Sequence, residues 1–172
     1  MIIPLLSVLL IAATTSRAGT PPAAEEVLKE AQAKAASENK VVFVHFGASW
    51  CGWCKRLEAF LASESIKPII DKHFVEIKLV VQENKANKNL ENPGADTLLK
   101  KVGGPAGLPY FAFIAPDGKT IVNSTRPESG NIGHPVQPQE IDWFITMLKK
   151  AAPKITEPEL KTIREQLEKQ RS

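Results

Sequence analysis

Two cysteines, separated by two residues, are the only ones in this chain of 172 residues, and they lie in the segment Trp50-Cys51-Gly52-Trp53-Cys54. Three kinds of chemistry use such a pair: a structural disulfide, half of a metal site, or a redox couple that alternates between dithiol and disulfide. The residues around the pair decide between these three.

A structural role for the pair is weakly supported. A disulfide that closes a ring of four residues stabilises a fold by only about 2 kcal/mol, against about 4.7 kcal/mol for a 100-residue loop. A structural zinc site uses four ligands, and the chain has no second cysteine pair. Its histidines, His45, His73 and His134, are not spaced as paired ligands. We therefore expect no metal.

A redox couple needs a nucleophilic thiol, a second thiol within reach, and a feature that lowers the pKa of the first thiol. A helix that begins near Cys51 supplies all three. Its unpaired backbone N–H groups and positive dipole end stabilise a thiolate, and Cys54 falls one turn later on the same side. We expect Cys51 to attack a substrate disulfide and Cys54 to resolve the mixed disulfide.

The elements that must position the pair are predicted from local patterns. The β-branched and aromatic run Val41–Phe46 indicates a central strand, and apolar residues at helical spacing predict a helix over 51–62 directly after it. A Pro-Asp-Gly-Lys turn at 116–119 predicts a hairpin. The other expected elements are helices over 23–40, 65–72, 95–102 and 139–150, strands over 74–81, 110–114 and 120–123, a solvated loop over 82–92 and irregular chain over 126–138.

The two ends of the chain differ from its middle. Residues 1–18 contain an apolar run of about a dozen residues, shorter than the roughly 20 that span a bilayer, and Ser16-Arg17-Ala18 at their end offers small residues at minus three and minus one. This pattern predicts a signal peptide cleaved after Ala18, the alternative being an uncleaved anchor. Residues 19–153 are expected to form the domain, and residues 154–172 a helical tail that docks on the body or on a partner, opened by a Thr156–Glu159 capping box.

The composition excludes some functions. The chain is 43% hydrophobic and 24% charged, as in ordinary globular proteins. Its net charge is +3, and its lysines and arginines alternate with aspartates and glutamates along the sequence. No basic segment indicates nucleic-acid binding. No glycine-rich dinucleotide loop occurs, so we expect no cofactor and infer that electrons come from another protein.

Two segments together resemble a known family. Trp50-Cys51-Gly52-Trp53-Cys54-Lys55 follows a buried strand, Gly107-Leu108-Pro109-Tyr110 opens the later hairpin, and an amphipathic helix closes the domain. This arrangement resembles the thioredoxin superfamily over about residues 24–151, and within it the secreted bacterial thioredoxin-like proteins. The resemblance implies an α/β thioredoxin fold, with a central mixed sheet of about four strands flanked by helices, and an extra C-terminal helix.

The resemblance also implies a substrate site. Pro109 should be a cis-proline that faces the cysteine pair, and Leu108 should offer its backbone to an extended substrate peptide. Trp50 and Trp53 should form apolar walls beside the reactive sulfur, and Gly52 should belong to the same substrate-binding segment.

Two positions depart from the family pattern. Trp53 stands between the cysteines, where thioredoxin itself has proline, and the other departure is a histidine in the central strand. His45 lies six residues before Cys51, where thioredoxins proper have a buried acid that assists proton transfer. Two interpretations remain: a core histidine bonded to a backbone carbonyl, or a group that takes part in proton transfer. His73 and His134 are interpreted as surface or loop residues.

These features predict an exported thiol–disulfide oxidoreductase that reduces or exchanges protein disulfides through the Cys51–Cys54 couple. We expect it in the periplasm or secreted, with protein thiols or disulfides as substrates and a membrane-bound or soluble thiol partner that recharges it. The alternative is a non-catalytic thioredoxin-like module that binds a partner through the groove and the C-terminal helix.

Overall fold

The computed structural model describes residues 19–104 and 107–171. The predicted signal peptide lies outside the described residues. Four strands form the main sheet: β1 (Val41–Gly47), β2 (Phe74–Val80), β3 (Tyr110–Ile114) and β4 (Thr120–Asn123). Their order is β2-β1-β3-β4, with β1 parallel to β2 and antiparallel to β3, and with β3 and β4 forming the predicted hairpin.

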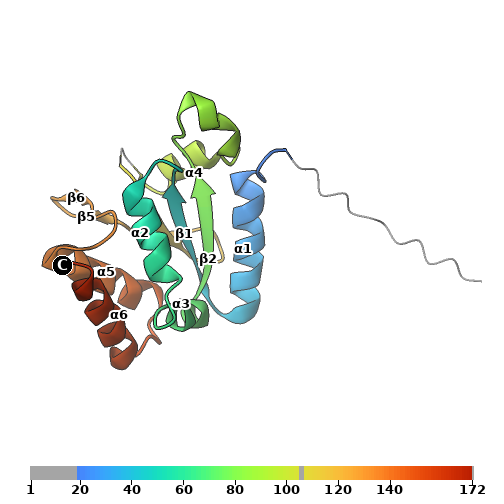
Figure 1. Ribbon diagram of the computed structural model, residues 1–172. Coiled ribbons are helices and arrows are strands. Elements are labelled where there is room, and N and C mark those ends of the chain that lie inside the picture. The colour runs from blue at the N-terminus through green and yellow to red at the C-terminus, as the bar shows by residue number, and fades with distance from the viewer. Residues whose placement is uncertain (1–18, 105–106, 172) are drawn as a thin grey trace, which may run out of the picture.

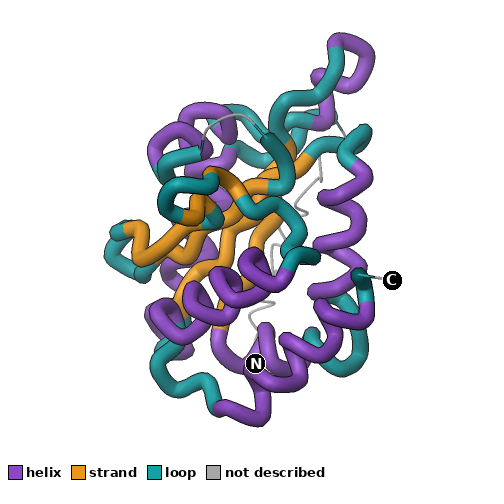
Figure 2. The backbone as a smooth tube through the Cα atoms, turned by 90° about the vertical axis from the view of Figure 1, so that its left-hand side faces the viewer, coloured by secondary structure: helices purple, strands orange, loops and turns teal. Residues whose placement is uncertain are grey.

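Helices cover both faces of this sheet (Figure 1, Figure 2). Helices α1 (Ala24–Glu38) and α4 (Ala95–Lys101) pack on one face. The other face carries α2 (Gly52–Leu61), α5 (Pro138–Ala151) and α6 (Glu157–Lys169), while α3 (Lys67–His73) leads into β2. Both faces of β1 are therefore buried, which explains why its sequence is apolar except at His45.

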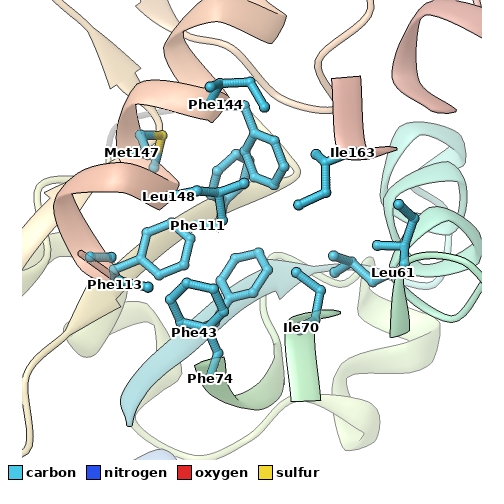
Figure 3. Packing of buried hydrophobic residues seen from close by; sticks show 14 of the residues in the cluster. Phe43, Leu61, Ile70, Phe74, Phe111, Phe113, Phe144, Met147, Leu148 and Ile163 are labelled. Atoms are coloured by element: carbon cyan, nitrogen blue, oxygen red, sulfur yellow. The ribbon is translucent and has the colours of Figure 1, made fainter. Parts of the chain in front are cut away.

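Aromatic rings fill the face under α2 and α5. The Phe43 ring lies 4.7 Å from the ring of Phe113 and 5.8 Å from that of Phe111, measured between centroids. Figure 3 shows these rings packed against Phe144 of α5 and beside Ile163 of α6. The C-terminal helix thus contributes to the same core as the sheet.

The C-terminal tail docks on the body. Its capping box forms as predicted, because Thr156 accepts a hydrogen bond from the backbone N–H of Glu159 while the Glu159 carboxylate accepts one from the backbone N–H of Thr156. Leu160, Ile163 and Leu167 are buried against α5 and the sheet. This is the thioredoxin fold with the extra C-terminal helix that the sequence predicted.

Two segments have more structure than the sequence indicated. Residues 82–92 are not simply a solvated loop, because they contain the 3-10 helix η1 (Lys85–Leu90) and a buried carboxylate at Glu83. They project from the body at one end of the sheet (Figure 1). Residues 126–138 are not wholly irregular either, because β5 (Thr125–Arg126) pairs with β6 (Gly130–Asn131). Long-range hydrogen bonds order both segments, and local sequence patterns do not show such bonds.

Candidate active site

The cysteine pair lies where β1 gives way to α2. Cys51 and Cys54 form a disulfide, and Cys51 is the N-cap residue of α2. The Sγ of Cys51 accepts a hydrogen bond from the backbone N–H of Cys54 at 3.1 Å. Backbone N–H groups at a helix N-terminus stabilise negative charge, so the same contact would stabilise a Cys51 thiolate once the disulfide opens. Both residues are at least 95% buried.

A close approach between β1 and α2 brings a carboxylate toward the second cysteine. A Cβ placed on Gly47 would lie 3.2 Å from the Cβ of Cys54 and 3.8 Å from Oε1 of Glu58. Glu58 is one helical turn beyond Cys54, and its Oε1 lies 2.6 Å from the Lys78 Nζ of β2. Glu58 was not predicted from the sequence, although its spacing of four residues from Cys54 was a visible signal.

His45 is buried in β1, as expected for a core residue. Its partner, however, is not a backbone carbonyl: Nε2 lies 3.0 Å from Oε1 of Glu76 on the neighbouring β2. The parallel register brings the two together, because Glu76 is the partner of Phe43 and lies on the same face of the sheet as His45. The structure therefore places an imidazole in contact with a carboxylate, and not an isolated imidazole, at this position.

Trp50 forms one side of the site and is tied to the segment 82–92. Its indole N–H donates to the carbonyl oxygen of Gln82 at 2.8 Å, while its side chain remains 55% exposed. Just before it, the hydroxyl of Ser49 donates to the buried Glu83 at 2.8 Å, and the backbone N–H of Ser49 donates to the other carboxylate oxygen. Asn87 donates to the same hydroxyl at 3.2 Å. The segment thus holds the chain that enters the site.

Leu108 and Pro109 form the opposite boundary. Their peptide bond is cis, the isomer that the family resemblance implies, and Leu108 packs against the cluster of Ala48 and the two cysteines. Asn131 of β6 holds this loop: its side-chain N–H groups donate to the carbonyl oxygens of Gly107 and Pro109 at 3.1 and 3.0 Å.

The acceptor side of Asn131 is used as well. Its Oδ1 accepts hydrogen bonds from the hydroxyl of Ser124 at 2.8 Å and from the backbone N–H of Gly133 at 3.2 Å. All four hydrogen-bonding positions of this amide are therefore occupied. No motif predicted Asn131, because the carbonyl groups to which it donates are more than twenty residues away.

Trp53 lies on the side of the cis-proline. Its ring is 47% exposed, stacks on the ring of His134 at 6.3 Å with an interplanar angle of 29°, and is covered on part of its face by the Arg56 guanidinium 4.8 Å away. A cavity of about 400 Å³ opens beside it. Its lining includes Trp53, Leu108, Pro109, Asn131, His134 and Glu140.

His134 is buried, which corrects its interpretation as a surface residue; it does lie in a loop. Burial lowers the pKa of its imidazole, so the ring is neutral near pH 7. Its Nε2 lies 2.7 Å from the side-chain oxygen of Gln170, whereas Nδ1 has no hydrogen-bond partner among the described residues. The chain after α6 covers this loop, and that cover is a tertiary feature.

His73 is also less exposed than predicted. It ends α3, its side chain is 7% exposed, and its Nε2 lies 3.1 Å from the carboxylate of Glu159. Lys72 binds the other oxygen of that carboxylate at 2.7 Å, and these hydrogen bonds together with the cap lower the pKa of Glu159 to about 2 despite its desolvation. This cluster lies at the start of β2, away from the cysteines.

The described part of the chain lacks a metal cluster and a membrane-spanning helix. In residues 19–104 and 107–171, no cluster of three or more histidine, cysteine or acidic side chains is arranged to hold a metal ion. Over the same residues, no helix is both long and apolar enough to cross a bilayer.

Comparisons with known proteins agree with this geometry. A family model described as thioredoxin-like matches residues 23–116. A disulphide isomerase from Xylella fastidiosa Temecula1 shares the fold at 22% identity and a TM-score of 0.50, with 87% of this chain and 92% of that chain covered. The reduced C-terminal domain of DsbD from Neisseria meningitidis is 27% identical with a TM-score of 0.45, covering 74% and 99%. No curated protein sequence matches significantly.

A strand–turn–helix unit that carries a Cys-X-X-Cys disulfide at a helix N-terminus defines a thioredoxin-fold redox protein. The chain belongs to the thioredoxin-like family, since the family model covers more than half of it. It is a thiol–disulfide oxidoreductase of that family, and it carries the Cys51–Cys54 disulfide.

Proposed function

We propose that this oxidoreductase acts on protein disulfides outside the cytoplasm, after its first 18 residues are removed. The observation that carries the proposal is the hydrogen bond from the Cys54 N–H to the Cys51 Sγ at the N-cap of α2. This contact makes Cys51 the better thiolate and therefore the attacking group. The apolar leader supports export.

In the proposed reaction the Cys51 thiolate attacks one sulfur of a substrate disulfide, and the other substrate sulfur leaves as a thiolate that takes up a proton. A mixed disulfide now joins Cys51 to the substrate. The Cys54 thiolate then attacks Cys51, the substrate departs as a second thiol, and the Cys51–Cys54 disulfide remains. The substrate gains two electrons, and a partner dithiol later returns the protein to its reduced form.

Substrate binding is assigned to the surface beside the pair. An extended peptide would lie along Leu108 and Pro109, with Trp53 and Gly52 on the other side of the reactive sulfur and Trp50 beyond them. The cavity of about 400 Å³ next to Pro109 supports this placement, because it is open and joins the cis-proline to Trp53. Half-exposed tryptophans suit a site that binds varied protein segments.

The proton of Cys54 must leave before the second step. We assign its acceptor to Glu58, because Glu58 lies one turn from Cys54 and both approach Gly47. Its Oε1 lies 2.6 Å from Nζ of Lys78, and the side chain is 33% exposed, so an accepted proton can pass on to solvent. The sequence-based candidate, His45, is two residues from Gly47 along β1 and is engaged by Glu76.

The proposal is tested with the purified mature chain in a reduction assay that uses insulin and a dithiol donor. We expect turnover by the wild type, none by Cys51→Ser, and trapped mixed disulfides with several proteins for Cys54→Ser. Full activity of Cys51→Ser would contradict the mechanism. Capture of one noncovalent partner, with no turnover by the wild type, would instead favour the binding-module alternative.

Export is tested separately. When the full-length chain is expressed in a bacterium with a periplasm, we expect a periplasmic product whose first residue is Gly19. An uncleaved chain that sediments with membranes would contradict the leader assignment and favour the anchor.

A further inference from the structure

The last turn of the chain reaches the substrate site through a pair of contacts. Gln170 directly follows α6, and its side-chain oxygen lies 2.7 Å from Nε2 of His134. The His134 ring stacks on the ring of Trp53, the residue between the two cysteines. A residue two positions from the C-terminus is thus linked to the centre of the active-site motif.

The contact with Gln170 fixes which nitrogen of His134 carries the proton. Because burial lowers the pKa of His134, the neutral ring carries one N–H, and the short contact to the Gln170 oxygen requires that proton on Nε2. The hydrogen bond fixes the ring plane, while the other nitrogen, Nδ1, has no partner among the described residues. One hydrogen bond therefore determines the orientation of the ring on which Trp53 stacks.

The ring also forms part of the wall of the cavity beside the cis-proline. His134 and Trp53 line the same cavity of about 400 Å³ as Pro109, and the adjoining Gly133 approaches Pro109, since a Cβ on Gly133 would lie 3.8 Å from the proline Cδ. A tilted His134 ring would change both the stacking surface of Trp53 and the width of the cavity. The disulfide itself would not move, because α2 and β1 hold it.

We propose that Gln170 is a positioning residue for substrate binding: through His134 it holds Trp53 in the orientation that protein substrates meet. The C-terminal helix is then a functional part of the groove as well as a part of the core. The inference rests on the proposed function, in which protein disulfides bind beside Pro109 and Trp53. It predicts an effect on substrate affinity and little effect on sulfur chemistry.

The test compares Gln170→Ala, Gln170→Glu and a matched control, Arg171→Ala, whose exposed side chain is one residue further on. With insulin as substrate, Gln170→Ala should raise KM about five-fold, the effect of one hydrogen bond, with kcat unchanged. Gln170→Glu retains an acceptor oxygen and should restore the wild-type KM. Arg171→Ala should behave as the wild type. With hydroxyethyl disulfide, which is too small to fill the groove, all four proteins should react at equal rates.

A second measurement separates positioning from a merely structural role. The Gln170 hydrogen bond raises the pKa of His134 against the effect of burial, so imidazole titration by NMR should give a lower pKa in Gln170→Ala and a higher one in Gln170→Glu. The expected order of pKa values is Glu variant, wild type, Ala variant. An unchanged titration in both variants would overturn the proposed contact.

The remaining outcomes are decisive as well. An active wild type with an unchanged KM in Gln170→Ala overturns the inference and leaves the proposed function standing. A parallel loss of kcat and thermal stability in Gln170→Ala also overturns it, because that result describes a packing residue. A wild type that reduces hydroxyethyl disulfide but not insulin refutes the protein substrate, and the inference falls with it.

Discussion

Two glutamate–lysine ion pairs lie at opposite ends of the same sheet and differ in what surrounds them. Glu58 and Lys78, 2.6 Å apart, lie near the end of β1 beside Cys54. Glu159 and Lys72, 2.7 Å apart, lie before the start of β2, where His73 and the Thr156 cap add further hydrogen bonds to the same carboxylate.

The difference teaches how one fold separates stability from reactivity. Glu159 has partners on both oxygens, its side chain is 15% exposed, and it fixes the start of α6 to the end of α3. Glu58 is 33% exposed and lies one helical turn from Cys54, whose proton we propose that it accepts. A carboxylate with many partners resists protonation, whereas one with a single flexible partner can accept a proton. The first arrangement suits a carboxylate that stabilises the fold, and the second suits one that transfers a proton.

The largest expected effect is at Glu58, the proposed proton acceptor. Glu58→Gln removes the proposed acceptor and should slow resolution of the mixed disulfide about 100-fold, the usual contribution of a general base. Stopped-flow measurement of mixed-disulfide decay checks this. The matched variant His45→Gln should change the decay far less; a larger loss there would transfer this role to the His45–Glu76 pair.

The second largest effect should appear at Asn131, which we expect to contribute both to stability and to substrate binding. Asn131→Asp places a carboxylate against the carbonyl oxygens of Gly107 and Pro109, so we expect a loss of about 2–3 kcal/mol in unfolding free energy together with a raised KM. Urea unfolding and insulin kinetics measure the two losses. The control Asn123→Asp, which disturbs one bond to Val102 away from the cis-proline, should destabilise the protein without changing KM.

Glu159→Gln, at the carboxylate that joins α6 to α3, should lower the unfolding free energy by about 1–2 kcal/mol at pH 7 and leave activity unchanged. The folded-state pKa of about 2 lies below the ordinary 4.5, so the stabilisation is complete above pH 4.5 and is lost as the pH falls through about 2. The difference in unfolding free energy between wild type and variant should therefore shrink as the pH falls from 4.5 to about 2, and urea unfolding measures it. Glu157→Gln, in the same helical turn but with an exposed partner, should change little.

The smallest expected effect distinguishes the two tryptophans. Trp53 lines the cavity beside Pro109, whereas Trp50 is hydrogen-bonded to Gln82 on the other side of the pair. Trp53→Ala should raise the KM for insulin about five- to ten-fold, and Trp50→Ala less than about two-fold. Equal effects from the two variants would mean that substrates contact both walls.

Local signals accounted for most of the fold. Alternating and helical patterns predicted the four strands and five of the helices to within a few residues, because β1 and the core helices carry strong apolar periodicity. The capping box at Thr156 predicted the start of α6, because capping also depends only on residues that are close in the sequence. The segments 82–92 and 126–138 lacked such periodicity, and their order comes from Glu83 and Asn131, whose partners lie far along the chain.

The sequence by itself determined where the cysteine pair lies. The spacing of Cys51 and Cys54 after an apolar strand is enough to place both sulfurs at a helix N-terminus, because that placement depends on residues within one turn. Tertiary structure alone decided which groups surround them. Gly47 of β1 approaches both Cys54 and Glu58 of α2, Glu76 meets His45 across two strands, and Gln170 reaches His134 over 36 residues. Such contacts depend on how helices pack on a sheet, and a periodic pattern shows which face of an element is buried but not which residue it will meet.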